Sequence, residues 1–366
     1  MSNSLQGLRV CYFGHFAPEW HRNRVLAKAL RHAGAEIILA SDQRRFMTRS
    51  ARLLRDALRF DFDLLLVGFP GHSDMPLARM IAARKRVPLI FDAHVSFYDS
   101  SVFTRRTARP GSLAAWRYYG MDRLSCALAD RVLLDAQAHI DYFVKTFGVN
   151  ARKCRRIWVG ADDGLVYPRD DVPRHAEFSV FWYGSFFPLH GVEHILEAAR
   201  LLQVDGQQAR FELAGAGPQL AEMKARAAAM GLTNVRFLGH VPYPELPGHA
   251  ARCHMSLGVF GDTPQTHRVI PNKVYDGLAM RLAVVTADTP AIREAMRPGE
   301  QVYTVPIANP VALAEAIARL ARDADLRESI AHQGYELFRR SFSIEAISEM
   351  ASSVLLETLS SSKRRK

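Results

Sequence analysis

Short apolar runs alternate along this chain with segments whose hydrophobic residues recur at helical spacing. The first half contains five strand-length runs and one clear helical segment: LRVCYFG, AEIILAS, FDLLLVGF, VPLIFDAH and RVLLDA, with VLAKALRHAG between the first two. The second half repeats the scheme with strand-like EFSVFWYG, ARFELAGAG, VRFLGHV, CHMSLGVF and LAVVTA, and with helical VEHILEAARLL and QLAEMKARAAAMG. Alternating strands and helices predict parallel sheets with right-handed crossovers. The pattern therefore predicts an α/β protein with two Rossmann-like domains.

The polar, proline-bearing segment ADDGLVYPRDDVPRHA separates the two series and is the expected linker. A chain of 366 residues is long enough for two cores. We expect a first domain over residues 1–170 and a second over 171–345, the latter with helices near 311–321 and 324–340. A helix over 346–360 is a candidate to cross back to the first domain, and the basic tail 361–366 is expected to be disordered.

The apolar runs are far shorter than the roughly 20 residues that cross a bilayer, and the N-terminus has no signal-peptide pattern. These features predict a cytoplasmic chain. The four cysteines lie far apart without a C-x-x-C pair, which favours buried thiols over disulfides or a zinc site. No metal site is expected.

Positive charge is concentrated in the first half of the chain. The net charge is +11, and residues 1–170 hold 27 Lys and Arg against 16 Asp and Glu, whereas residues 171–366 hold 21 of each. A one-sided basic surface attracts phosphates, anionic lipid or nucleic acid. Two basic segments stand out: RRFMTRSARLLRDALRF, which has the pattern of a basic amphipathic helix, and TRRTARPGSLAAWRYYGMDR.

These two segments predict peripheral docking on anionic lipid and an acceptor carried on a lipid or a polyanion. A solvated arginine face that packs its stems on the core is the alternative. The residues expected on the acceptor or membrane side are Arg22, Asn23, Arg45, Arg49, Arg52, Arg105 and Arg106.

Four stretches of the second half carry a family resemblance: YGSFFPLHGVEHILEAARLL, FELAGAGP, NVRFLGHVPYPELP and LGVFGDTPQTHRVIPNKVYDGLAM. In this order and near this spacing they resemble glycosyltransferase family 4, the group 1 glycosyltransferases, over about residues 180–300. The first half is similar more loosely, through FGHFAPEWHRN, FDAHVSFYDS and IWVGADDGLVYP.

The resemblance implies a GT-B fold, in which the two Rossmann-like domains have parallel sheets that face each other across an interdomain cleft. It implies that the C-terminal domain binds a nucleotide-sugar donor and the N-terminal domain binds a glycan or lipid-linked acceptor. The implied activity is metal-independent transfer with retention, in cell-surface polysaccharide or glycolipid biosynthesis. A UDP- or GDP-sugar is the expected co-substrate, and no other cofactor is expected.

Glycines at the ends of predicted strands are candidate donor contacts. Gly184 follows FSVFWY, and Gly215 and Gly217 follow ARFELA, where missing side chains let a backbone approach a phosphate or base. Tight turns between strand and helix are the alternative explanation for each glycine.

The segment RVIPNKVYDGLAM gives the strongest local signal for anion binding. Pro271 stops one element, so Asn272 and Lys273 offer amides and an ammonium at the start of a helix. The resemblance implies that Asp276 takes the later place in an acidic E-x7-E pattern and grips the donor ribose. Arg268 replaces the earlier acid, and we expect Arg268 and Lys273 to be phosphate ligands.

The loop YGSFFPLHG departs from the family, which commonly has an Arg and a Lys there to neutralise the leaving diphosphate. Ser185 and His190 occupy the matching positions. Ser185 can only form hydrogen bonds, and His190 is expected to be cationic for part of the time near neutral pH.

In the first domain, His94 lies just past a predicted strand, where the family has a histidine close to the sugar. Gly14 and His15 follow the first strand, and with Arg22 and Asn23 they are expected to form the opposite lip of the cleft. His94 would position the sugar and acceptor, while cations and helix-terminal amides stabilise the leaving diphosphate.

Three other functions stay open. A nucleic-acid-binding protein would explain the basic first half, but the chain has no recognition-helix, RRM or zinc-finger pattern. A GT-B sugar-nucleotide 2-epimerase needs several cleft carboxylates as acid and base, and few are predicted. A non-catalytic sugar-nucleotide-binding subunit is compatible with the substitutions at Arg268, Ser185 and His190.

Overall fold

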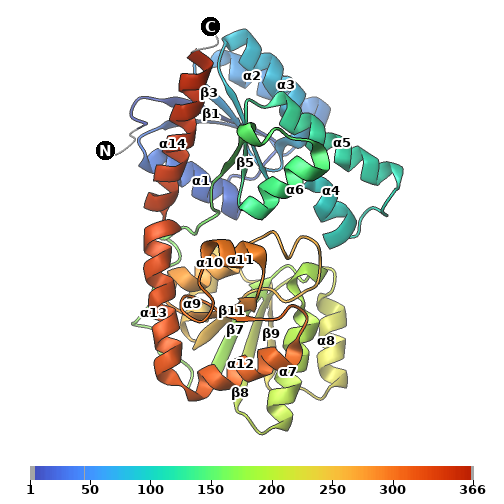
Figure 1. Ribbon diagram of the computed structural model, residues 1–366, viewed down its shortest axis with the longest axis vertical. Helices are drawn as coiled ribbons and strands as arrows, with labels where there is room; N and C mark the ends of the chain where they lie inside the picture. Colours follow the sequence, from blue (N-terminus) through green and yellow to red (C-terminus); the bar gives the residue numbers. More distant parts are fainter. Residues whose placement is uncertain (1–4, 45, 364–366) are drawn as a thin grey trace. The chain divides into compact units, whose positions relative to one another are not determined.

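The computed structural model describes residues 5–44 and 46–363, which form two compact units (Figure 1). The first unit comprises the described residues up to Val102, Arg106–Gly160 and the segment from Ile344 onward. The second comprises Phe103–Arg105 and Ala161–Ser343. The segment interpreted above as a linker therefore packs with the second unit.

The first unit is built on a six-stranded parallel sheet in the order β2-β1-β3-β4-β5-β6. The strands are β1 (Arg9–Gly14), β2 (Glu36–Ser41), β3 (Leu64–Val67), β4 (Leu89–His94), β5 (Arg131–Leu134) and β6 (Cys154–Arg156). Five of them coincide with the apolar runs of the sequence. The predicted parallel α/β architecture is confirmed for this half.

Four helices cover one face of this sheet: α2 (Phe46–Arg59), α3 (Met75–Lys85), α5 (Leu113–Leu128) and α6 (Gln137–Phe147). Their buried side chains, such as Leu53, Ile81 and Phe143, share a core with the alternate residues Cys11 and Phe13 of β1. Side chains of a strand alternate between faces, so the intervening residues of β1 face the other side. We call α2, α3 and α5 the outer helices of the first unit.

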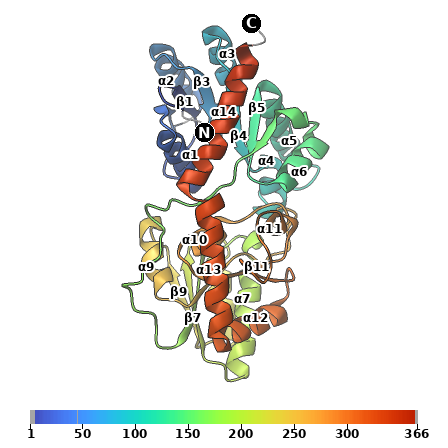
Figure 2. The same cartoon turned by 60° about the vertical axis from the view of Figure 1, so that its left-hand side comes forward.

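Helices α1 (His21–His32) and α14 (Ile344–Lys363) pack against each other outside that core (Figures 1 and 2). α14 buries Ile347, Ala351 and Leu355. It extends past the expected end at 360, so the expectation of disorder from 361 is wrong for residues 361–363. Arg131 Nη2 donates to Ser361 Oγ at 3.2 Å and holds this last turn. Residues 364–366 lie outside the described part of the chain.

The second unit has its own six-stranded parallel sheet in the order β12-β11-β10-β7-β8-β9. Its strands are β7 (Phe178–Gly184), β8 (Ala209–Gly215), β9 (Val235–Gly239), β10 (Met255–Leu257), β11 (Ala283–Ala287) and β12 (Tyr303–Val305). Helices α7 (Val192–Val204), α8 (Leu220–Ala229) and α12 (Pro310–Arg322) share the core on one face.

Helices α9 (Leu246–Ala251) and α10 (Asn272–Ala279) contact β7 from outside that core, and α10 also contacts β10 and β11. α11 (Pro290–Ala295) follows β11, and α13 (Ala324–Ser341) leads toward α14. The helices expected near 311–321 and 324–340 correspond to α12 and α13. α10 and the strand-end loops beside it hold most of the donor candidates.

All four cysteines are buried and free of disulfides, as the sequence predicts. In the described part of the chain, no helix combines the length and apolar character needed to span a bilayer.

Candidate functional site

Backbone packs directly on backbone where β7 and β8 end in the second unit. Gly215 has φ 133°, and a Cβ there would lie 1.9 Å from the Gly184 carbonyl oxygen. Gly217 has φ 155°, and a Cβ there would lie 1.6 Å from the Ser185 carbonyl oxygen. Only glycine fits both positions. Loop packing therefore gives Gly215 and Gly217 a structural role before any ligand is considered.

Lys273 is a buried lysine at the start of α10. Pro271 caps the helix, and Asn272 is its first residue. The Lys273 ammonium lies 5.4 Å from the ring centroid of Trp182 and 5.8 Å from that of Tyr183, within range of cation–π attraction. Burial lowers the pKa of Lys273 to about 7, although the nearby Asp276 opposes this shift. An anion arriving at this helix end would favour the charged ammonium.

Asp276, one turn further along α10, is buried and held by two tyrosines. Tyr183 OH donates to Asp276 Oδ2 at 2.5 Å, and Tyr243 OH lies 3.0 Å from both carboxylate oxygens. Asp276, Lys273 and the two tyrosines line one apolar pocket. The tyrosines thus fix the carboxylate that the resemblance assigns to the donor ribose.

Sequence reasoning missed both tyrosines as site residues. Tyr183 directly precedes Gly184 at the end of β7, and Tyr243 lies in the stretch NVRFLGHVPYPELP that carries the resemblance. The first position was a usable signal, because residues at the carboxyl ends of parallel strands line ligand sites.

His190 is neutral, which corrects the expectation that it carries part of a charge. Burial, and then the neighbouring Lys273, hold the pKa of His190 well below its usual range. Ser185 is exposed and directly follows β7, and Arg268 is half-buried in the segment that leads to α10. This region therefore offers Lys273 and Arg268 to an anion, and also Arg105, whose guanidinium lies 5.6 Å from the ring centroid of Phe187.

In the first unit, His94 ends β4 in an unusual backbone conformation. Its φ is 53°, and such strain in a residue other than glycine is commonest at functional sites. His94 Nδ1 lies 3.8 Å from Asp135 Oδ2, and Asp135 Oδ1 is 2.5 Å from His139 Nδ1. Burial lowers the pKa of His94 to about 4, so a neutral imidazole is presented at neutral pH. Asp135 follows β5 directly, and this position also went unused in the sequence analysis.

Gly14 and His15 lie at the end of β1 in the same unit. Gly14 has φ 117°, His15 N donates to Asp74 Oδ2 at 2.7 Å, and His15 Nδ1 lies 3.1 Å from the Asp42 carbonyl oxygen. Asp74 also accepts from Arg49 Nε at 3.0 Å. Arg49 is buried by this ion pair, so it is unavailable to a membrane, contrary to the expectation.

Arg22 and Asn23 are also buried and have structural partners instead of an acceptor. Arg22 forms a two-oxygen ion pair with Asp92, at 2.9 and 3.0 Å, and donates to two backbone carbonyls. Asn23 accepts from Tyr12 OH at 3.0 Å and also donates to two carbonyls. The expectation that they line an acceptor or membrane surface is wrong, because their polar atoms are used inside the unit.

The remaining basic candidates have three different outcomes. Arg45 lies outside the described residues. Arg52, on α2, pairs with Asp56 at 3.5 Å, so part of its charge is already balanced. Arg105 and Arg106 are exposed.

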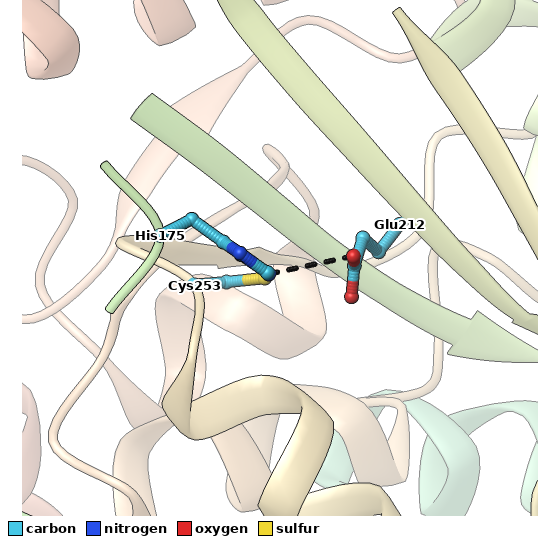
Figure 3. A group of neighbouring side chains, drawn as sticks. All are labelled: His175, Glu212 and Cys253. Carbon is cyan, nitrogen blue, oxygen red and sulfur yellow. Dashed lines mark ion pairs between the residues drawn. The ribbon is translucent and has the colours of Figure 1, made fainter. Parts of the chain in front are cut away.

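A separate group of ionisable side chains lies at the amino-terminal edge of the second sheet (Figure 3). His175 precedes β7, Cys253 precedes β10, and Glu212 lies on β8; within the described ranges they alone form a histidine, cysteine and acid group with donor atoms within 4.8 Å of one another. Glu212 is already paired with Arg210 at 2.8 Å, and burial raises the pKa of the Cys253 thiol to about 12. The charge of Glu212 is thus already paired within the second unit, and the group lies away from the carboxyl ends of the strands.

Comparisons with known proteins agree with this architecture. Residues 6–165 match the family described as Glycosyltransferase Family 4, and residues 177–323 match Glycosyl transferases group 1. The chain is 24% identical over 286 residues to an alpha-D-kanosaminyltransferase of Streptomyces kanamyceticus, which covers 74% of the chain and 71% of that protein.

Two solved structures share the fold. HepE of Anabaena, solved with UDP-glucose, matches with a TM-score of 0.74 at 16% identity, over 96% of this chain and all of that one. Sucrose-phosphate synthase of Thermosynechococcus elongatus matches with a TM-score of 0.75 at 15% identity, over 97% of this chain and all of that one. With two parallel α/β sheets, GT-B structural relatives and both halves matched in sequence, the chain belongs to the group 1 glycosyltransferases, glycosyltransferase family 4.

Proposed function

We propose that this protein is a retaining glycosyltransferase that takes its sugar from a nucleotide-diphosphate sugar held by the second unit. The observation that carries the proposal is the start of α10, where a buried lysine and a tyrosine-bound carboxylate stand one turn apart. Lys273 and the first amides of α10 suit a diphosphate, and Asp276 suits the hydroxyls of a ribose.

In this proposal, the main task of catalysis is to stabilise the negative charge of the leaving diphosphate. When the bond between the anomeric carbon and the diphosphate breaks, its electron pair goes to the diphosphate and positive charge develops on the sugar. Lys273, Arg268 and the α10 amides would stabilise the departing anion. Since His190 is neutral, these groups take the place of the basic pair that relatives commonly carry at Ser185 and His190.

We propose that these cations serve without a metal ion. The sequence has two Asp-x-Asp motifs, at Asp61 and Asp63 and at Asp323 and Asp325. Asp323 accepts from Leu326 N at 2.9 Å and caps α13, and the carboxylates of the other motif are engaged as well. Asp61 pairs with Lys85 at 3.4 Å, and Asp63 Oδ2 accepts from Arg9 N at 2.9 Å beside β3.

The acceptor is proposed to be a glycan or lipid-linked molecule that the first unit binds at the cytoplasmic face of the membrane, for cell-surface polysaccharide or glycolipid synthesis. The excess of positive charge in residues 1–170 supports an anionic or lipid-borne acceptor. His94, neutral and at a strand end, would orient the sugar and acceptor by hydrogen bonds.

A thermal-shift panel of UDP-, GDP-, ADP- and dTDP-sugars tests the donor site. A ligand that binds only the folded protein raises its apparent stability, so we expect one nucleotide class to raise Tm clearly. UDP-sugars are the first choice, because HepE was solved with UDP-glucose. A panel without any shift at millimolar concentrations would remove the donor site. Binding without transfer or donor hydrolysis would favour the non-catalytic subunit instead.

Replacing His94 by alanine is expected to lower kcat for transfer at least tenfold and to leave the donor-induced rise in Tm intact. His94 belongs to the first unit, so its loss should affect the positioning of the reactants more than donor binding. Steady-state kinetics on the purified variant measure the effect, and His32→Ala, at an exposed histidine that ends α1, is the control. A kcat within twofold of the wild type would exclude a catalytic role for His94.

A further inference from the structure

Exposed apolar side chains gather on the outer helices of the first unit. Twelve large hydrophobic side chains are exposed among the described residues, and seven of them lie on α2, α3 and α5 or directly after α2. These seven are Leu54, Leu58, Phe60, Met80, Leu113, Trp116 and Leu124. The other five are spread over both units. A concentration of this kind marks a contact surface.

Helix α5 carries three members of the group, among them the most exposed one. Leu113 is 89% exposed and Trp116 is 63% exposed, and Leu124 lies two turns beyond Trp116 on the same stripe. The opposite side of α5 is buried at Ala115 and Cys126. α5 therefore carries apolar side chains on its outward face as well as on its buried face.

The surroundings of this stripe are basic and nearly free of acidic side chains. Arg106, Arg109, Arg117 and Arg123 are exposed, and none has a carboxylate within ion-pair distance in the part of the chain that is described. From Ser100 to Ala129 the sequence has a single acidic residue.

That residue is Asp122, whose charge is directed inward. Asp122 is fully buried and accepts hydrogen bonds from Ser96 Oγ and from the amides of Phe97 and Tyr98. The outer surface of α5 thus combines leucine, tryptophan and unpaired arginine. By contrast, Arg52 and Arg55 on α2 share Asp56, so α2 contributes apolar area more than net charge.

We propose that α2, α3 and α5 form a docking face for an anionic lipid bilayer, with the Leu113–Trp116 end of α5 inserted into the interface (Figure 1). Leucine and tryptophan gain free energy by leaving water for the headgroup and acyl boundary, and tryptophan suits this boundary because its ring is amphipathic. Each arginine near an anionic surface adds electrostatic attraction to it. A nucleic acid would use the arginines but would leave Leu113 and Leu124 in water.

This docking face deepens the proposed function, because a lipid-linked acceptor is what would bring the enzyme to a membrane. The test uses the full chain and sedimentation with vesicles of phosphatidylcholine, alone or mixed with phosphatidylglycerol. We expect binding to the mixed vesicles that weakens as salt is raised, because the exposed charges are screened.

The double variant Leu113→Ser/Trp116→Ser should lower the partition coefficient on mixed vesicles about tenfold or more, because it removes two apolar side chains that leave water on binding. The matched control is Val204→Ser/Val311→Ser, which removes two side chains of the second unit that are 71% and 54% exposed. The control should partition like the wild type.

Equal partitioning of both double variants, or equal binding to vesicles with and without phosphatidylglycerol, would overturn the docking face. Retention on DNA without vesicle binding would also overturn it, in favour of a polyanion surface. The donor-induced rise in Tm, measured on the same samples, separates the two proposals: if it persists while vesicle binding is absent, the docking face fails and the donor site stands.

Discussion

Replacing Lys273 by methionine is expected to lower kcat/KM for sugar transfer about 100-fold, which corresponds to roughly 2.7 kcal/mol of transition-state stabilisation. Methionine keeps the apolar stem in its place beside Trp182 and Tyr183 and removes only the charge that would face the diphosphate. Steady-state kinetics at fixed acceptor concentration measure the loss. Lys224→Met, at an exposed lysine of α8, is the control, and an equal effect of both changes would remove Lys273 from the site.

The pH dependence of donor binding gives the same prediction a second, independent signature. In the protein without a bound donor, Lys273 has a pKa of about 7, so its amine is mostly charged below neutral pH and mostly neutral above it. A bound diphosphate favours the charged form, so wild-type affinity should fall severalfold as pH rises from about 6.5 to about 8.5. The Lys273→Met variant should bind weakly at each pH without this slope. A slope that survives the substitution would assign the titration to another group.

Replacing Gly217 by alanine is expected to lower the free energy of unfolding by about 3 kcal/mol or more. The added Cβ would lie 1.6 Å from the Ser185 carbonyl oxygen, a clash that only movement of the β7 loop could relieve. Urea denaturation of the purified variant measures the change.

Gly206→Ala is the matched control for this substitution. Gly206 also has a positive φ, 69°, but no atom lies within 4 Å of the Cβ position, so only backbone strain of about 1 kcal/mol is expected. If the two variants were equally stable, the packing of the loops would have no energetic weight.

Much of the fold could be predicted from the sequence because the signals are local. The buried strands β3 and β4 appear as continuous apolar runs, and Pro271 marks the start of α10 to the residue. Asp276 and Lys273 were also predictable as neighbours, because residues three apart in a helix share one side.

The parts that failed depend on partners far apart in sequence. Arg22 is separated by 70 residues from Asp92, which buries it, and Arg49 by 25 residues from Asp74. The residues next to Arg22 and Arg49 in the sequence do not indicate that either side chain will be buried. The charge state of His190 follows from burial and from Lys273, which come together only in the folded unit.

The return of the chain through α14 has a consequence for biosynthesis. The first sheet leaves the ribosome early, yet α1 has its packing partner only when α14 emerges, about 200 residues after β6. Until then, the side of α1 that packs against α14 is uncovered, and exposed surface of this kind is prone to aggregation. A nascent chain that has been made only as far as Ser343 would contain all strands of both sheets, while the first unit would still lack α14.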